Sequence, residues 1–370
     1  MNKQKSSSLS QLALQKFKKN FWGVLSFWFV VFCFFLAIFA YVVAPDDSEN
    51  SNQMHLAIHS KNPGFSVKML SFPVQESSQN VFSSFFFGNK ISSAEIPISS
   101  YKITQDTLYA QPYTGEGIEG LTKTYTLAEN FEGVASWEEV EKEFLQQKTF
   151  YLGTDKYGRD MLSRMLVGIR ISLSIGFVAV FISLVIGISL GAIAGYYGGK
   201  VDQAIMWLIN VTWSIPTLLL VIAITLALGK GFWQVFIAVG LTMWVEVARV
   251  VRGQVLGVKK LAYVTAARAL GFSNFRIIQK HIIPNIIAPV IVISAANFAA
   301  AILVESGLSF LGIGAQPPTP SWGGMIKDHY SYIILGKPYL AIIPGLAIMS
   351  LVMAFMLIGN ALRDALDVRT

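Results

Sequence analysis

The sequence predicts an all-α polytopic membrane protein with six membrane-spanning helices. Only 14% of the 370 residues are charged and 53% are hydrophobic, whereas an ordinary soluble domain carries roughly 25% charged residues. The apolar residues are gathered into runs of about 20, the length that crosses a bilayer core of roughly 30 Å. The net charge of +7 does not indicate nucleic acid as a partner, because the Lys and Arg residues flank the apolar runs. Membrane lipid is the expected surrounding.

The first apolar run, residues 22–44, follows a polar segment, residues 1–21, which we expect to be cytoplasmic. The run is longer than the apolar core of roughly 7–15 residues in a cleaved signal peptide, so it is interpreted as a retained anchor. An amphipathic helix at residues 159–170 is expected to lead into the second span, and Pro216 is expected to kink the third. Five further runs predict the remaining spans, at residues 171–196, 204–228, 232–247, 286–303 and 339–357.

Residues 45–150 form a polar, Ser- and Asn-rich insert after the first span. Alternating segments at 101–104 and 123–127 predict short strands, and residues 136–139 predict a helix start with a capping serine and an acidic first turn. We therefore expect an extracytoplasmic α/β or mainly β insert. Its aromatic patch, residues 82–87, is expected to form a small core of the insert, with docking on a partner or on the membrane as the alternative.

The distribution of basic residues predicts that both termini are cytoplasmic. Residues 249–285, between the fourth and fifth spans, carry seven Lys and Arg residues, whereas residues 304–338 carry only Lys327 and Lys337. Such a bias marks the cytoplasmic side. Arg159, Arg164 and Arg170 run against this orientation, next to a long translocated loop where the rule is weakest.

The stretch from Leu261 to Pro284 predicts two short helices that meet at a sharp corner. Gly271 suits the left-handed residue that ends a helix, and Ser273 is placed to cap a second helix. Apolar residues repeat every three positions on one side of the first helix, at Leu261, Val264, Ala267 and Leu270. This apolar side requires a cover, and the pattern leaves open whether a partner protein or the membrane interface provides it.

This loop resembles the EAA loop of ABC importer permeases. The resemblance rests on Thr265-Ala266-Ala267, Gly271 and Ile282-Ile283-Pro284. Thr265 replaces the family's Glu, which removes any salt bridge that the Glu would make. His281 replaces an Ile, as is familiar in the peptide/nickel branch. Further segments similar to that branch follow in the same order, at residues 152–160 (LGTDKYGRD), 195–199, 249–252, 281–285, 308–312, 320–323 and 362–367, with Val368 where Pro is usual.

The match covers nearly 60% of the chain and is closest to the C-type permease of oligopeptide and dipeptide importers. It implies the six-helix type I ABC importer permease fold, in a bacterial cytoplasmic (inner) membrane. Residues 151–370 would form the transmembrane permease core, with the cytoplasmic coupling loop at about 249–285. The implied function is a peptide importer subunit that forms half of the translocation pathway, and a permease for nickel or another small solute is the alternative.

The implied partners are a second, B-type permease, two cytoplasmic ATPases and an extracytoplasmic substrate-binding protein. The chain has no Gly-x-x-x-x-Gly-Lys-Ser/Thr loop, so it is expected to bind no cofactor itself, and ATP and Mg belong to the ATPases. The resemblance assigns ATPase coupling to one set of residues, with Gly271 as the corner. They are Tyr263, Thr265, Ala266, Ala267, Arg268, Gly271, Phe275, Arg276, His281 and Pro284.

Polar residues within or beside spans are candidates for pathway or partner contacts. Glu246 lies one turn from Arg249 and is expected to pair with it locally. Asn297 and Asn210 either bond between helices or line the path. Glu305 is placed to meet a peptide amino terminus, the binding protein or the partner permease. Trp322, in the loop 312–324, either faces the binding protein or packs as a lid on the chain's own helices.

Two other classes of function are weaker. A membrane-embedded enzyme would need paired acids or a metal-spaced cluster, whereas Glu246 and Glu305 are expected near opposite faces of the membrane. The one cysteine, Cys33, and four scattered histidines offer no metal-ligand spacing. A stand-alone channel or carrier is disfavoured because the sequence shows no inverted repeats or paired broken helices, and because the basic corner would then lack a purpose.

Overall fold

The computed structural model describes residues 9–73, 81–90, 94–115, 117, 120–229 and 231–366. Asp367, the last residue of the family-like segment 362–367, and the following Val368 lie outside the described residues, which end at Leu366. The chain divides into two compact units. The helical unit consists of Met1–Phe34, Ser172–Gln316 and Gly345–Thr370, and the mixed unit consists of Phe35–Ile171 and Pro317–Pro344.

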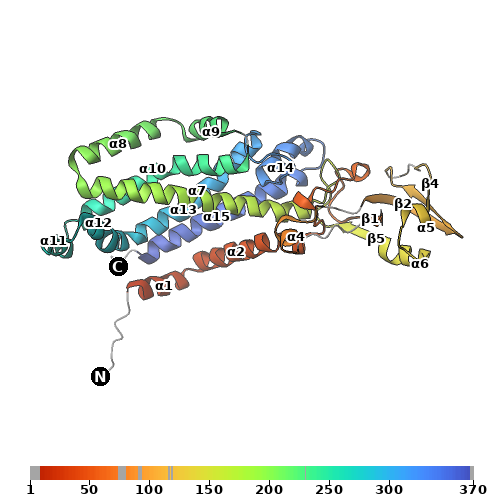
Figure 1. Ribbon diagram of the computed structural model, residues 1–370, viewed down its shortest axis with the longest axis horizontal. Coiled ribbons are helices and arrows are strands. Elements are labelled where there is room, and N and C mark those ends of the chain that lie inside the picture. The colour runs from red at the N-terminus through yellow and green to blue at the C-terminus, as the bar shows by residue number, and fades with distance from the viewer. Residues whose placement is uncertain are drawn as a thin grey trace, which may run out of the picture. The chain divides into compact units, whose positions relative to one another are not determined.

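Five described helices are long and apolar enough to cross a membrane. They are α2 (Phe21–Ile38), α7 (Met161–Tyr197), α10 (Phe232–Val258), α13 (Ile287–Phe310) and α15 (Tyr339–Leu366), all labelled in Figure 1. A bent pair, α8 (Gly199–Ser214) and α9 (Thr217–Leu228), makes a sixth if it counts as one span. The helical, membrane-spanning class is confirmed, with five or six spans against the six predicted.

The third predicted span is broken rather than kinked. α8 and α9 meet at 93°, and Figure 1 shows the bend between them. Pro216 has no backbone N–H, and its ring pushes the preceding residue out of the helical region. Ile215 is accordingly extended, with φ −91° and ψ 129°. Two half-helices replace the expected single rod.

Helix α7 corrects the expectation of a separate amphipathic helix at 159–170. It begins at Met161 and runs unbroken for 37 residues, or about 55 Å at 1.5 Å per residue. The N–H of Ser163 donates to the Asp160 carboxylate at 2.7 Å, which satisfies one of the free donors of the first turn. The basic stretch is therefore the first part of a spanning helix that is longer than a bilayer core of about 30 Å.

Glycines at a spacing of four allow α7 to pack closely on α10. A Cβ added at Gly187 would lie 2.5 Å from the Val247 side chain, and one at Gly195 would lie 2.8 Å from that of Val255. Gly191 meets the backbone of Ala248 in the same way, at 2.5 Å. Small residues at this spacing let two spanning helices approach each other. This contact fixes the end of α10 from which the predicted coupling loop emerges.

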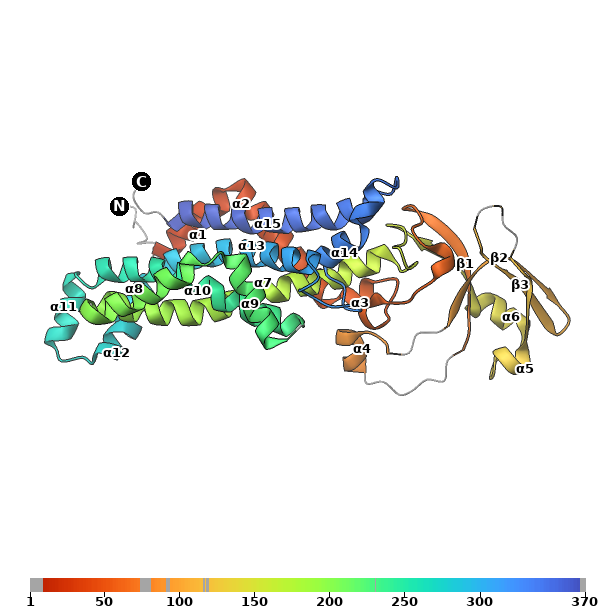
Figure 2. The same cartoon turned by 90° about the horizontal axis from the view of Figure 1, so that it is seen from above.

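The insert contains a five-stranded antiparallel sheet with the order β4-β3-β2-β1-β5. Figure 2 labels β1, β2 and β3 of this sheet. The strands are β1 (Phe65–Ser71), β2 (Glu95–Thr104), β3 (Thr107–Pro112), β4 (Lys123–Thr126) and β5 (Leu145–Phe150). The strand expected at 101–104 is the end of β2, and that expected at 123–127 is present as β4 except for Leu127, which begins α5. The helix expected at 136–139 is also present as α6, with the Ser136 hydroxyl accepting the N–H of Glu139.

Two apolar clusters cover parts of this sheet. One gathers Leu70, Leu108 and Phe131 with their neighbours under the short helices, and the other gathers Ile58, Met69 and Phe150. The remaining short elements are α1 (Leu9–Lys19), α3 (Ala40–Val43), α4 (Val81–Phe87), α5 (Leu127–Asn130), α6 (Trp137–Glu139), α14 (Trp322–His329), η1 (Glu49–Ser51), η2 (Leu56–Ile58), η3 (Val140–Phe144) and η6 (Tyr330–Ile333).

The expectation that the aromatic patch at 82–87 forms the core of the insert is wrong. The patch is helix α4, and its residues are absent from both apolar clusters of the sheet. The Phe85 ring instead packs against that of Phe39, between α2 and α3, at 5.7 Å. Phe82 and Phe87 are 69% and 64% exposed. The alternative interpretation, a surface that docks elsewhere, therefore remains.

Candidate functional site

The predicted corner between two short helices is present at the end of α10. Helix α11 (Ala262–Ala269) is followed by Gly271 at φ +77° and then by α12 (Asn274–Ile277). The chain continues through a π-turn, η4 (Ile278–Ile282), and a 3-10 turn, η5 (Ile283–Asn285), before α13 begins. Residues close to one another in the sequence are enough to explain this course of the backbone.

Backbone hydrogen bonds at Gly271 form a Schellman motif. The N–H of Phe272 donates to the Ala267 carbonyl at 3.2 Å, and the N–H of Gly271 donates to that of Arg268 at 3.0 Å. The motif needs a left-handed residue between the two bonds, which glycine adopts without a Cβ penalty. Two residues later the Ser273 hydroxyl accepts the N–H of Arg276 at 3.4 Å and caps α12. Both predicted roles, corner and cap, are confirmed.

The expected apolar stripe is only half buried. Val264 and Ala267 lie in one core with Val251 and Val255 of α10 and with Ile277 of α12. Leu261 and Leu270, which the three-residue repeat placed on the same side, are 48% and 73% exposed. The repeat fails at both ends because α11 starts at Ala262 and ends at Ala269, so these two leucines lie outside the helix.

The exposed tip of the corner is apolar and flanked by cations. Leu270 and Phe275 are 73% and 72% exposed on either side of Gly271. Arg268 and Arg276 are also exposed, and the Arg276 guanidinium lies 4.4 Å from the centre of the Phe272 ring. We call this surface, made of Leu270, Gly271, Phe275 and the two arginines, the corner tip.

The other predicted coupling residues surround the corner tip or support it. His281 stacks on the Phe272 ring with centroids 5.8 Å apart, and the Tyr263 hydroxyl donates to the His281 carbonyl at 3.5 Å. Thr265 and Ala266 are exposed on α11, and Pro284 is exposed in η5. The Thr265 hydroxyl contacts only the Leu261 carbonyl of its own helix, at 3.5 Å.

Polar clamps tie the corner to the spanning helices of the helical unit. Lys259 donates to the Gly195 carbonyl at 2.7 Å, at the C-terminal end of α7, where a cation complements the helix dipole. Arg252 of α10 makes two hydrogen bonds to the Asp202 carboxylate of α8, at 2.5 and 2.6 Å. The Tyr196 hydroxyl donates to Asn274 of α12 at 2.8 Å. These contacts connect the corner to α7 and join α10 to α8.

The expected local pair between Glu246 and Arg249 is wrong. Arg249 donates to the Asn210 side chain of α8 at 2.8 Å and lies 3.6 Å from the Trp213 ring centre, and no ion pair joins it to Glu246 in the described chain. A neighbouring helix thus supplies better partners than the next turn. Glu246 instead lines a cavity of about 250 Å³ with Thr212, Thr217 and Thr242 beside the break at Pro216.

Asn297 and Glu305 are both buried in α13, at 1% exposure. One Glu305 oxygen accepts the Ser309 hydroxyl at 2.6 Å, and the same hydroxyl accepts the N–H of Ala315 at 3.1 Å. The second Glu305 oxygen and the Asn297 amide nitrogen have no hydrogen-bond partner within the described residues. Glu305 therefore orders the turn after α13, and in this conformation it offers no surface to a binding protein.

Trp322 packs inside the mixed unit. It is 3% exposed, its indole N–H donates to the Met165 carbonyl of α7 at 3.1 Å, and a Cβ added at Gly168 would lie 2.9 Å from its ring. Of the two roles left open by the sequence, packing on the chain's own helices is the one found. The Trp322 side chain is not available to contact a partner.

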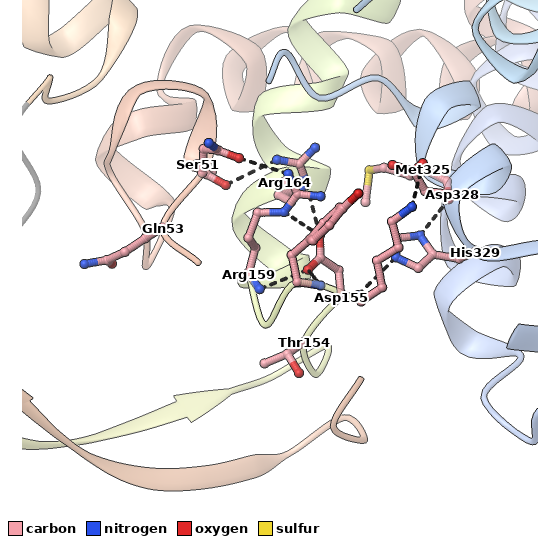
Figure 3. Close-up of polar contacts among 12 residues, drawn as sticks. Ser51, Gln53, Thr154, Asp155, Arg159, Arg164, Met325, Asp328 and His329 are labelled. Atoms are coloured by element: carbon pink, nitrogen blue, oxygen red, sulfur yellow. Dashed lines mark hydrogen bonds and ion pairs between the residues drawn. The ribbon is translucent and has the colours of Figure 1, made fainter. Parts of the chain in front are cut away.

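A buried ionic cluster, which sequence analysis treated only as a family signature, lies before and at the start of α7 (Figure 3). Asp155, with no exposed surface, holds Arg159 at 2.6 Å and Arg164 at 3.7 Å. Arg159 also donates to Asn52 at 2.9 Å. Arg159 and Arg164 do not follow the excess of basic residues on the cytoplasmic side. They are buried structural partners of a carboxylate and do not indicate a side of the membrane.

The cluster continues to α14 through Lys156 and His329. Lys156 pairs with Asp328 at 3.0 Å, and its N–H donates to His329 Nε2 at 3.3 Å. His329 Nδ1 lies 2.7 Å from the Met325 carbonyl. Burial lowers the pKa of the His329 imidazole, and the nearby carboxylates of Asp155 and Asp328 only partly offset this. The spacing of Asp and Arg in LGTDKYGRD was the signal that could have indicated a paired cluster.

Comparison with known proteins identifies the family. Residues 187–370 match the model of the binding-protein-dependent transport system inner membrane component, and residues 8–63 match that of the N-terminal TM domain of oligopeptide transport permease C. The two ranges leave residues 64–186, which include the whole sheet, outside both models.

Curated relatives agree with these models. The chain is 42% identical over 217 residues to the glutathione transport system permease protein GsiD of Pectobacterium atrosepticum, covering 59% of this chain and 72% of the relative. It is also 42% identical to the dipeptide transport system permease protein DppC of Bacillus subtilis, covering 59% of this chain and 68% of the relative.

Among solved structures, the methionine ABC transporter MetNI, in an inward-facing conformation, overlaps 55% of this chain and 97% of the matched chain, with a TM-score of 0.46 and 18% identity. The assignment rests on the sequence relatives. The chain belongs to the family of inner-membrane permeases of binding-protein-dependent ABC transport systems, in the branch of the oligopeptide and dipeptide permeases.

Proposed function

We propose that this chain is one of two permease subunits of an ATP-driven importer of small peptides. The peptide substrate is supported by the relatives named for dipeptide and glutathione transport. The subunit has the type I importer fold, crosses a bacterial cytoplasmic membrane with both termini inside, and carries its sheet on the outer side. Its partners are a B-type permease, two cytoplasmic ATPases that hold ATP and Mg, and a substrate-binding protein.

The observation that carries this proposal is the corner tip. Leu270 and Phe275 expose apolar surface beside a rigid left-handed turn, with Arg268 and Arg276 around them. Water is a poor environment for this surface, and a groove in a protein partner can bury it. The cationic rim favours a groove with acidic edges, because charge complementarity selects and orients partners.

Coupling follows from the contacts behind the corner. Val264, Ala267 and Ile277 pack into the core formed with α10, so α11 and α12 cannot shift independently of that helix. The Arg252–Asp202 pair carries the same displacement to α8. Closure of two ATPases on ATP would therefore rotate α7, α8 and α10 together.

The substrate path is proposed beside the break at Pro216. The cavity of about 250 Å³ is lined from α8, α9, α10 and α13, and it contains Glu246 and three threonines. A carboxylate at this position suits the amino terminus of a peptide. Broken helices line polar paths because their freed backbone groups need partners.

Substitution at Gly271 tests the coupling role. A Cβ added at Gly271, where φ is +77°, would meet no neighbouring atom within 4 Å, so the cost of valine is conformational, about 1–2 kcal/mol and higher for a β-branched residue. That cost lowers the ratio of formed to unformed corner by a factor of roughly 5–30. Gly271→Val should cut uptake of a labelled dipeptide in membrane vesicles containing the whole transporter, with normal abundance in the membrane. Normal uptake would contradict the proposal.

Gly257→Val is the matched control. Gly257 lies on α10, close to the corner, and is equally open, but its backbone is helical. Uptake should be retained in this variant.

Affinity purification of the tagged chain in mild detergent tests the partners: a second permease and ATPases should be recovered, and recovery of the chain alone would favour a channel or carrier. If the transporter took up nickel instead of the dipeptide, the proposed substrate would be wrong, but the proposed coupling role would not be affected.

A further inference from the structure

The aromatic helix α4 has no role in the proposed transport cycle, and its depth in the membrane can be derived. The first span, α2, has 18 residues, or about 27 Å of helix, which is shorter than a bilayer core of about 30 Å. After a break at Phe39, the four apolar residues of α3 supply the missing length. Helix α3 therefore lies at one boundary of the hydrocarbon core.

Contacts within the mixed unit hold α4 at the same depth as α3. The Phe85 ring packs edge-on against Phe39 at 5.7 Å. Arg170 donates to the Phe86 carbonyl at 2.5 Å and lies 5.3 Å from the Tyr41 ring centre. A Cβ added at Gly88, which ends the helix, would lie 2.7 Å from that tyrosine ring. These contacts leave α4 little freedom to move away from α3.

The large exposed side chains of α3 and α4, and of the end of the first span before them, are apolar. Phe35, Phe39 and Val42 follow one another at helical spacing and are 54%, 42% and 63% exposed. Val43 and Phe87 extend this surface at 53% and 64% exposure. A patch of aromatic and branched apolar residues at this depth is the composition found at membrane interfaces.

We propose that α3 and α4 form a shelf that lies in the headgroup region of the bilayer, with lipid as its occupant. The shelf anchors the start of the insert to the membrane surface. Lipid, rather than a protein partner, is favoured because the exposed stripe is the direct continuation of a span whose outer face contacts lipid. The half-buried Arg170 guanidinium, between the Tyr41 ring and the Phe86 carbonyl, holds α3 and α4 together in this shelf.

A spin label at a single engineered cysteine tests the shelf. Cys33 is the only cysteine of the chain, so a Cys33→Ser background accepts one label at Phe87→Cys. The full chain is reconstituted in phosphatidylcholine and phosphatidylglycerol vesicles. Collision of the label with oxygen, which partitions into lipid, is then compared with collision with a water-soluble nickel chelate.

Two positions in the mixed unit calibrate the measurement. Phe35→Cys reports the lipid face of the first span, and Leu121→Cys, at a residue 90% exposed before β4, reports water. The ratio of oxygen to nickel accessibility at Phe87 should exceed that at Leu121 severalfold and approach that at Phe35. A ratio equal to that at Leu121 would overturn the shelf. Low accessibility to both reagents would also overturn it, because a protein would then cover the surface.

Val42→Cys gives a second, independent reading on α3 if the label at Phe87 disturbs folding. The same outcomes apply there: a high ratio supports a lipid-covered shelf, and a ratio typical of water or of a protein contact contradicts it. None of these positions belongs to the corner tip or to the cavity beside Pro216, so the result does not depend on the proposed transport function.

Discussion

Replacement of Asp155 by asparagine should destabilise the mixed unit strongly. The carboxylate has no exposed surface and neutralises Arg159 and Arg164, whose side chains are only 4% and 7% exposed. It also accepts the N–H groups of Tyr157 and Arg159 at 2.8 and 3.0 Å. Both N–H groups donate to Oδ1, which the amide oxygen of asparagine can replace, but asparagine leaves the two buried guanidinium groups beside Oδ2 without a counter-charge.

The expected loss is about 3–5 kcal/mol, the cost of removing one partner of a buried ion pair. For a domain of this size, about 2–4 °C is lost per kcal/mol, so the melting temperature in detergent should fall by roughly 6–20 °C. Asp328→Asn is the matched control. Its partner Lys156 and Asp328 itself are 24% and 33% exposed, and such a pair contributes at most about 1 kcal/mol.

Thermal unfolding of the purified chain, followed by intrinsic fluorescence, measures both variants. A second substitution, Arg164→Gln in the Asp155→Asn background, should recover part of the lost stability, because it removes one of the unpaired buried charges. The reasoning would be refuted if Asp155→Asn melted within about 4 °C of Asp328→Asn, since the arginines would then be solvated in the folded protein.

Two further predictions concern the same unit. Because burial lowers the pKa of His329, the unfolded chain binds a proton near pH 6.5 that the folded chain does not. Stability should therefore be full above about pH 6.5 and fall as the pH drops below it; His329→Gln should weaken this dependence in melting curves, and an unchanged profile would contradict the assignment. Gly158→Ala should abolish folding or lower the melting temperature far more than Gly64→Ala, because both glycines have positive φ but only at Gly158 would a Cβ overlap the His55 carbonyl. Equal losses in the two variants would show that the loop adjusts.

Signals confined to a few residues predicted much of the candidate site. The corner depends on hydrogen bonds that span at most six residues, from Ala267 to Phe272, and on a serine cap three residues from its donor. The spanning helices depend on length and apolarity, which composition alone reveals. A kink at Pro216 was predicted, but the break into two half-helices at 93° was not.

The partners of the polar and aromatic side chains were not predictable in the same way. Arg249 finds Asn210 on a neighbouring helix instead of Glu246 on its own, and Trp322 is buried against α7. Phe85 packs on the end of the first span instead of forming a core for the insert. In each case the deciding contact joins residues that are tens to more than a hundred positions apart.

The sequence by itself determined that the chain crosses a membrane, that it carries a left-handed corner at Gly271, and that it resembles ABC importer permeases. Only the tertiary structure decided which surface of that corner stays exposed, how the arginines near Asp155 are neutralised, and where α4 lies. The physical reason is the separation along the chain of the residues that interact. Helix length, capping and turn geometry follow from interactions between near neighbours in the chain, whereas burial and ion pairing depend on which distant segment covers a side chain.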